Sequence, residues 1–317
     1  MDSLIAHNNG TDPTYFIGFN QISDMSFTEF SSTVLMKQFD KQRTPPNTGA
    51  ARVYRARRMG RRLAQTLPNA FDWRTRRLPP VRDQGGCGSC WTFAAASVIE
   101  SRARISGLAG AADDLSEQQA RMVDCVHSRL GYWSAGCNGG YTDEALDFVA
   151  ATGTSRYSCS EANYAYKQAT GPACLTPATA PTGSVDIPSY AFINPTPTDI
   201  MAAIYNNGPV TVYFNVQNSF YGYTSGIYPA SACTADTINH AMVIVGSSYW
   251  GDGGYIKVQM TADTNGACFM CYSWGLLTVS STLAALTTPA LTTPSPPAAQ
   301  APKPQTALAA PFQAAPL

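Results

Sequence analysis

Residues 84–91, with the sequence QGGCGSCW, constrain what this chain can fold into more than any other segment. Two cysteines lie three residues apart, with only glycine and serine between them, directly before an apolar run at residues 91–99 that predicts a buried helix. A thiol at a helix N-terminus lies at the positive end of the helix dipole, which lowers its pKa toward thiolate at neutral pH. The segment therefore predicts a nucleophilic Cys90 at the start of a buried helix.

The neighbours of Cys90 favour catalysis over the other uses of a Cys-x-x-Cys pair, which are a disulfide or half of a zinc site. The glycines let backbone and substrate come close. The side-chain amide of Gln84 lies one turn earlier, where it can donate a hydrogen bond to a developing oxyanion. With these neighbours the segment resembles the catalytic stretch of the papain-like cysteine proteases, Cys-Gly-[Ser/Ala]-Cys-[Trp/Tyr]. The resemblance implies that Cys90 is the nucleophile and Gln84 an oxyanion donor.

Composition limits the class of protein. The 317 residues suffice for one large or two ordinary domains, and a net charge of zero with 13% charged residues argues against nucleic acid as a partner. The sequence contains no run of 18 apolar residues, so it predicts no membrane-spanning helix. Nine cysteines favour an oxidising compartment, and their odd number fits disulfides plus one reactive thiol. Because the N-terminus lacks the features of a signal peptide, we expect that the true start of the chain is missing.

Residues 1–39 resemble part of the inhibitory propeptide of cathepsin L-like proteases. The pattern Gly-x-Asn-x-Phe-x-Asp of that propeptide recurs, with isoleucine in place of phenylalanine, at Gly18, Asn20, Ile22 and Asp24. The resemblance implies that this part inhibits the enzyme before activation. An ordinary surface strand and helix is the alternative.

Residues 40–66 differ in composition from the segments on either side. They begin with a cluster of turn-forming residues and carry six arginines within residues 52–62. A run of like charge is typical of a solvated linker, and exposed arginines make a linker easy to cleave. Because residues 67–74, LPNAFDWR, resemble the start of mature papain-like enzymes, we expect the activating cleavage near residues 66–67.

Residues 67–280 resemble the peptidase domain of this family, which implies an α+β, papain-like fold of two subdomains. Residues 67–180 predict the helical subdomain, where Ser116 and Gln119 form a capping box that predicts a further helix. Residues 181–280 contain short β-branched runs that predict a β-barrel-like subdomain. The active-site cleft is expected between the two subdomains.

The resemblance also implies a substrate-binding strip and a specificity pocket. In the family, Cys-Asn-Gly-Gly binds an extended peptide through main-chain hydrogen bonds, because no side chains intervene; a simple turn is the alternative. The pocket takes the side chain two residues before the scissile bond. Tyr213 stands where the family often has a small aliphatic residue, so we expect a preference for medium apolar over aromatic side chains. The residues implied in substrate binding are Gly139, Gly140, Tyr141, Thr142, Tyr213 and Ala241.

His240 is the implied general base, which a cysteine protease needs to hold the thiolate and to protonate the leaving amine. It begins the run His-Ala-Met-Val-Ile-Val-Gly, which resembles the segment of the family's catalytic histidine. A lone histidine beside a strand is more often structural. The other two histidines, His7 and His127, lie in the propeptide-like part and in a polar loop.

The resemblance breaks at the third catalytic residue. The family places an asparagine in a strand after the histidine, within Asn-Ser-Trp-Gly, but no asparagine occurs between His240 and Tyr255. The group that orients the imidazole is therefore unassigned, and one strand is missing or rebuilt. Two interpretations remain open: an active cysteine endopeptidase, and a catalytically weakened or inactive homologue or incomplete gene product.

The remaining expectations also follow from the resemblance. No metal and no cofactor are implied. The expected partners are peptide and protein substrates, the chain's own propeptide and cystatin-like inhibitors, with no nucleic acid, and the enzyme is expected to be a lysosomal, vacuolar or secreted monomer. Residues 281–317 are rich in proline, alanine and threonine, which predicts a disordered tail. The implied disulfides join Cys87 with Cys137, Cys125 with Cys174, and Cys233 with Cys268.

Overall fold

The computed structural model describes the parts of the chain that carry the implied active site. The described residues lie within one compact unit, Met1–Thr287, and Thr288–Leu317 lie outside the described residues. The described residues are 2–10, 15–20, 22–43, 51–54, 67–68, 70–75, 78–108, 114–118, 123, 126, 131–150, 159–171, 185–194, 196–229, 237–248, 255–259, 267–269, 277–279 and 284–285.

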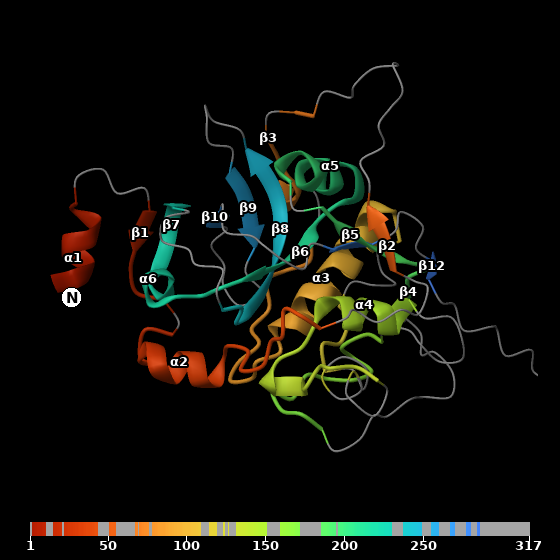
Figure 1. The fold of residues 1–317 in the computed structure, drawn as a ribbon, viewed down its shortest axis with the longest axis horizontal. Coiled ribbons are helices and arrows are strands. Elements are labelled where there is room, and N and C mark those ends of the chain that lie inside the picture. Colours follow the sequence, from red (N-terminus) through yellow and green to blue (C-terminus); the bar gives the residue numbers. More distant parts are fainter. Residues whose placement is uncertain are drawn as a thin grey trace, which may run out of the picture. The chain divides into compact units, whose positions relative to one another are not determined.

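The helix predicted after the cysteine pair is α3, Cys90–Ile105. Thirteen of its residues are buried, as the apolar run predicted, because alanines at 94–96 let neighbouring elements pack closely against it. It packs against α4, Thr142–Ala150, and against β8, His240–Ser248 (Figure 1). Basic side chains in its last turn, Arg102 and Arg104, favour the negative end of the helix dipole. The prediction of a buried helix that starts at Cys90 is confirmed.

The described part of the chain contains a ten-stranded sheet, in which strands of the predicted β-rich part are joined by three strands from residues 15–72. β8 pairs antiparallel with β6, Val210–Phe214, and with β9, Tyr255–Gln259. Mixed helix and sheet confirm the α+β class. The order along the sheet is β1 (Tyr15–Ile17), β7 (Tyr223–Tyr228), β10 (Ala267–Phe269), β9, β8, β6, β11 (Leu277–Val279), β5 (Tyr190–Ile193) and β2 (Ala51–Tyr54), with β3 (Ala70–Asp72) paired to β8.

The other elements are short. In α2, Ser26 caps the helix through a hydrogen bond that its Oγ accepts from the Glu29 N–H, and Glu29 accepts one from the Ser26 N–H at 2.7 Å. β4, Val185–Asp186, pairs with β12, Ala284–Ala285. The helices and 3-10 turns are α1 (Asp2–Asn8), α2 (Phe27–Thr33), η1 (Trp73–Thr75), η3 (Gly136–Asn138), α5 (Pro197–Asn207) and α6 (Asn218–Tyr221).

Two segments differ from the expectation. Residues 114–118 are not helical, because the Ser116 hydroxyl donates to the Tyr164 carbonyl and the Leu115 N–H donates to the Glu100 carboxylate at 2.6 Å. The predicted capping box itself stays a prediction, because Gln119 and residues 120–122 lie outside the described residues. Within the expected solvated linker, β2 pairs in parallel with β5; the rest of that linker from residue 55 to 66 lies outside the described residues.

Residues 2–43, which we call the N-terminal segment, form part of the hydrophobic core. Phe30, Val34 and Leu35 are at most 8% exposed and belong to the same cluster as side chains of α5, β6 and β8. β1 of this segment pairs antiparallel with β7. Because its apolar side chains complete a core of the rest of the unit, the segment is held by packing as well as by hydrogen bonds.

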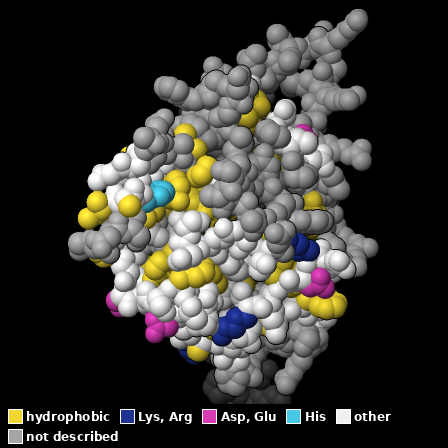
Figure 2. Space-filling view, turned by 60° about the vertical axis from the view of Figure 1, so that its left-hand side comes forward, with side chains coloured by type: hydrophobic (Ala, Val, Ile, Leu, Met, Phe, Trp, Pro, Cys, Tyr) yellow, Lys and Arg dark blue, Asp and Glu magenta, His cyan; other side chains and the backbone are white. Residues whose placement is uncertain are grey.

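The face that carries the N-terminal segment shows patches of hydrophobic side chains, with acidic and basic side chains toward its lower and right-hand parts (Figure 2). Four large apolar side chains in or beside β1 and β7 are between 42% and 72% exposed: Ile5, Phe16, Phe19 and Ile227. Among the described residues, no helix is both long enough and apolar enough to cross a membrane.

Candidate active site

The first residue of α3, Cys90, carries a free and fully buried thiol. Cys87 forms a disulfide with Cys137, as the resemblance implied, so the Cys-x-x-Cys pair is not itself bridged. The backbone N–H of Ala241 donates to Cys90 Sγ at 3.3 Å. This bond joins the start of α3 to the start of β8, and it places the thiol beside the residue that follows His240.

The other two implied disulfides cannot be located. Cys125, Cys174 and Cys233 lie outside the described residues, and Cys268 is described only as backbone in β10.

The His240 side chain is buried, with 2% exposure, and burial lowers its pKa to about 4. Neither ring nitrogen has a hydrogen-bond partner among the described residues. One of the strands that pair with β8 is β9, and its last residue, Gln259, lies opposite Val243. The residues that follow it, 260–266, lie outside the described part. The described residues therefore contain no group that orients the imidazole in place of the asparagine.

The protonation of the pair differs from the expectation that the helix terminus lowers the Cys90 pKa. Burial raises the pKa of the Cys90 thiol to about 12, although the N–H groups of Ala241, Trp91 and Cys90 itself act in the opposite direction. Desolvation thus outweighs the helix terminus. Burial therefore favours the neutral forms of both the thiol and the imidazole in the covered site.

Gln84 is fully buried and already donates to carbonyl oxygens. Its Nε2 lies 2.8 Å from the Val34 carbonyl oxygen and 2.9 Å from that of Cys87. The loop around it is held by Tyr166, whose hydroxyl donates to the Gln84 carbonyl at 2.8 Å and lies 2.5 Å from Ser89 Oγ. The Val34 carbonyl of the N-terminal segment therefore accepts a hydrogen bond from the Gln84 amide, which the sequence resemblance assigned to an oxyanion.

After α2, the N-terminal segment runs past the start of α3 toward α4 (Figure 1). The Met36 N–H donates to the Asn239 carbonyl at 2.8 Å, and the N–H groups of residues 37 and 38 donate to the Asn138 carbonyl at 2.8 and 3.0 Å. Gly139 has φ +125°, and a Cβ there would lie 2.7 Å from the Gln38 carbonyl oxygen. Only glycine allows this close approach. The main chain of the N-terminal segment therefore lies along the strip that was implied to bind substrate.

The implied pocket residues come together around Phe39. Its ring centroid lies 4.9 Å from that of Tyr141 and 4.6 Å from that of Tyr213. The Tyr213 hydroxyl accepts from the Thr142 N–H at 2.6 Å, and Tyr213 lies opposite Ala241 in the sheet. The phenyl ring of Phe39 thus fits between Tyr141 and Tyr213 in the covered site. The preference of the enzyme for medium apolar over aromatic substrate side chains stays a prediction.

Gly140 completes this side of the site. A Cβ at Gly140 would lie 2.4 Å from the Trp91 ring, whose indole N–H donates to the Gly136 carbonyl at 3.2 Å. Glycine at this position therefore lets the strip lie directly against α3.

An acidic cluster beside the pocket was not found from the sequence. Arg43 forms ion pairs with Asp143 and with Glu144, the latter at 3.5 Å, and its guanidinium carbon lies 3.6 Å from the centre of the Tyr141 ring. Asp143 lies a hundred residues from Arg43, and no local pattern links the two. The sequence signal available was only an Asp-Glu pair in the first turn of a predicted helix.

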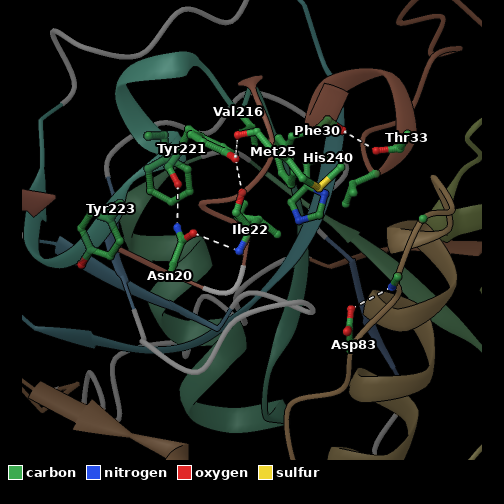
Figure 3. A pocket seen from close by; sticks show the side chains of 14 residues that line it. Asn20, Ile22, Met25, Phe30, Thr33, Asp83, Val216, Tyr221, Tyr223 and His240 are labelled. Atoms are coloured by element: carbon green, nitrogen blue, oxygen red, sulfur yellow. Dashed lines mark hydrogen bonds between the residues drawn. The ribbon is translucent and has the colours of Figure 1, made fainter. Parts of the chain in front are cut away.

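A pocket of about 350 Å³ lies beside His240, between the N-terminal segment and the rest of the unit (Figure 3). Met25 and Phe30 line it from the segment, and Val216 and Tyr221 line it from the opposite side. The Tyr221 hydroxyl donates to the Met25 carbonyl at 2.7 Å. His240 is therefore covered by side chains of the N-terminal segment.

A buried ion cluster positions the loop that leads to Gln84. Arg82 binds Glu100 of α3 at 2.7 Å and also pairs with Glu117. Both carboxylates are nearly inaccessible, and Arg82 pairs at 3.0 Å with the exposed Asp114. The cluster fixes the chain two residues before Gln84 against the helix that carries Cys90.

Comparisons with known proteins show similarity to cysteine proteases along most of the chain. Over 274 residues the chain is 29% identical to pro-cathepsin H of Mus musculus, covering 80% of this chain and 75% of that protein. It is 32% identical over 279 residues to thiol protease aleurain of Arabidopsis thaliana, covering 81% and 71%. Its fold is similar to that of the digestive procathepsin L2 proteinase of Tenebrio molitor, with a TM-score of 0.68, 26% identity and 84% of each chain covered.

The family model described as papain family cysteine protease matches residues 67–273. These residues include α3 with its free thiol, the strip at residues 137–140 and the strand that begins at His240. The chain belongs to the papain family of cysteine proteases.

Proposed function

We propose that this chain is a cysteine endopeptidase made as a zymogen, with Cys90 as nucleophile, His240 as general base and acid, and Gln84 as oxyanion donor. One observation carries the proposal: the Val34 carbonyl accepts a hydrogen bond from the Gln84 amide while its chain crosses the start of α3. A main-chain carbonyl therefore occupies the place where the carbonyl of a scissile peptide would bind.

The reaction would begin when His240 takes the thiol proton and Cys90 Sγ attacks the scissile carbonyl carbon. The carbonyl oxygen gains negative charge, which Gln84 Nε2 and the Cys90 N–H stabilise by hydrogen bonds. The imidazolium gives its proton to the leaving amine as the C–N bond breaks. Water, deprotonated by His240, then hydrolyses the thioester and restores the thiol.

In the proposed zymogen, residues 1–39 are the remaining part of the inhibitory propeptide and residues 40–66 contain the activating cleavage site. Residues 67–280 are the peptidase domain, and residues 281–317 are a tail without a core. Support for inhibition comes from the main-chain bonds of Met36 to Asn239 and of residues 37 and 38 to Asn138, which block the strip.

The competing function is a weakened or inactive papain-like protein. It is favoured by the His240 ring, which has no hydrogen-bond partner among the described residues. Without an orienting group, the imidazole samples more than one orientation and tautomer, which slows proton transfer.

The two functions differ in the turnover of an internally quenched peptide after the N-terminal segment has been removed. We expect Cys90→Ala to abolish turnover, His240→Ala to lower kcat by ~10²–10⁴-fold, and Gln84→Ala to lower it by ~10²–10³-fold. His127→Ala is the control for loss of a histidine and should leave kcat unchanged. Absence of turnover by the folded, cleaved wild type would favour the inactive protein.

The remaining parts of the proposal concern the setting of the enzyme. We expect a monomer that acts on peptide and protein substrates and is inhibited by cystatin-like proteins. A lysosomal, vacuolar or secreted location fits the disulfide between Cys87 and Cys137, since disulfides persist in oxidising compartments.

A further inference from the structure

Arg43, in the N-terminal segment, is enclosed by an aromatic ring and two carboxylates of the peptidase domain. Its side chain is 7% exposed, and its guanidinium lies over the face of Tyr141 while pairing with Asp143 and Glu144. Stacking on an aromatic ring together with carboxylate pairing is a geometry that suits a planar guanidinium and not an ammonium.

The groups that receive Arg43 belong to the peptidase domain and remain there after the N-terminal segment has left. Glu144 is fixed by hydrogen bonds from the N–H groups of Trp133 and Ser134, at 2.9 and 2.8 Å, and from Ser134 Oγ at 2.6 Å. Tyr141 is fixed by its N–H, which donates to Ser134 Oγ at 3.0 Å. The acidic site is therefore organised independently of its present occupant.

Loss of Arg43 removes the counter-charge from the Asp143 carboxylate. Asp143 is 3% exposed, and its Oδ2 has no hydrogen-bond partner among the described residues even with Arg43 in place. With Arg43 gone, two carboxylates remain beside the face of the Tyr141 ring, and this arrangement favours binding of another guanidinium.

The acidic site lies along the path that a substrate is proposed to take. The N-terminal segment passes Gln84 at Val34, contacts the pocket at Phe39 and reaches Tyr141 through the Asp40 N–H, which donates to the Tyr141 hydroxyl at 2.7 Å. The acidic site thus lies on the Tyr141 side of Cys90, next to the specificity pocket that holds Phe39.

We propose that Tyr141, Asp143 and Glu144 form a subsite that binds an arginine side chain of the substrate, on the amino-terminal side of the scissile bond. This inference rests on the proposed function, because a peptide must be cleaved for a substrate preference to exist. Arg43 occupies the same subsite in the zymogen and leaves it on activation.

The main test compares kcat/KM for peptide pairs in which arginine is replaced by citrulline, its neutral isostere, at the third or fourth position before the scissile bond. For the cleaved wild type we expect arginine to be preferred by about tenfold or more at one of these positions, since a hydrogen-bonded charge pair is lost. Asp143→Asn should bring the ratio near one. Asp72→Asn, the same substitution on β3, should leave the ratio unchanged.

A second readout needs no turnover and uses the full chain. Arg43→Ala removes the occupant, and ethylguanidinium chloride at low millimolar concentration should raise the Tm of this variant relative to potassium chloride at equal ionic strength. The rise should be absent from the double variant Arg43→Ala, Asp143→Asn.

The outcomes separate this inference from the proposed function. Absence of cleavage of every peptide refutes the proposed function and the substrate preference together, and the Tm readout then decides whether the guanidinium site exists. Cleavage with an arginine-to-citrulline ratio near one at both positions of the wild type overturns the inference and leaves the proposed function standing.

Discussion

Cleavage that removes the N-terminal segment is expected to raise the alkylation rate of Cys90 at pH 7 by at least ~10³-fold. In the covered site burial raises the pKa of the Cys90 thiol to about 12, which favours the unreactive neutral thiol at neutral pH. Uncovering restores solvent to Cys90 and His240, which lowers the thiol pKa and raises the imidazole pKa. The measurement is the rate of iodoacetamide modification of Cys90, followed by mass spectrometry in the full chain and in the cleaved protein.

The pH profile gives a further check on the same change. For the cleaved protein we expect alkylation below pH 7, since the thiolate is then stabilised by a protonated His240. The full chain should react measurably only at strongly alkaline pH. The Cys90→Ala variant is the control, because any alkylation of it reports modification of other cysteines. Equal rates in the full chain and the cleaved protein would contradict the account of the covered site.

The second large effect is expected from Arg82→Met, which should lower the free energy of unfolding by ~3–5 kcal/mol. The substitution leaves Glu100 and Glu117, which are at most 1% exposed, without their buried counter-charge. Because Arg82 lies two residues before Gln84, kcat should fall as well. Urea unfolding at pH 8 measures the stability.

The cost of Arg82→Met should depend on pH. Burial raises the pKa of Glu100 to about 8 and that of Glu117 to about 7, above the unfolded value of about 4.3. The folded protein therefore binds more protons than the unfolded chain, and stability falls as pH rises from about 4 to 8. Loss of Arg82 raises both pKa values further, so the penalty should be larger at pH 8 than at pH 5.

Arg74→Met is the matched control. Arg74 pairs with Asp72 at 2.7 Å, but its side chain is 41% exposed, and exposed pairs contribute about 1 kcal/mol or less. A loss from Arg82→Met no larger than that from Arg74→Met would contradict the role given to the buried cluster.

The parts of the fold that were predicted correctly are those with a strong local signal. The apolar run after Cys90 predicted α3, because burial of one continuous run is typical of a core helix. The short β-branched runs of residues 181–280 predicted a β-rich part, which contains β6 and β8. The motif residues Gln84 and Cys90 lie within a few residues of each other, so their joint placement required little tertiary information.

What could not be predicted depends on contacts between distant residues. The contacts of Leu115 with Glu100 and of Ser116 with Tyr164 join segments that are far apart in the sequence. The Cys90 pKa moved opposite to the expectation because the thiol is fully buried. The propeptide-like pattern indicated an inhibited site but not how deeply the thiol is buried. The pairing of Arg43 with Asp143 likewise joins two segments that only the fold brings together.

The central claim is that Cys90 and His240 act together although the family's asparagine is missing. The most direct test is covalent labelling of the cleaved protein by an epoxide probe for cysteine proteases, in wild type and His240→Ala at pH 6. We expect one label per molecule, on Cys90, in the wild type and labelling slowed to the rate of an ordinary thiol in His240→Ala. Equal labelling rates in the two folded proteins would show that His240 does not activate Cys90.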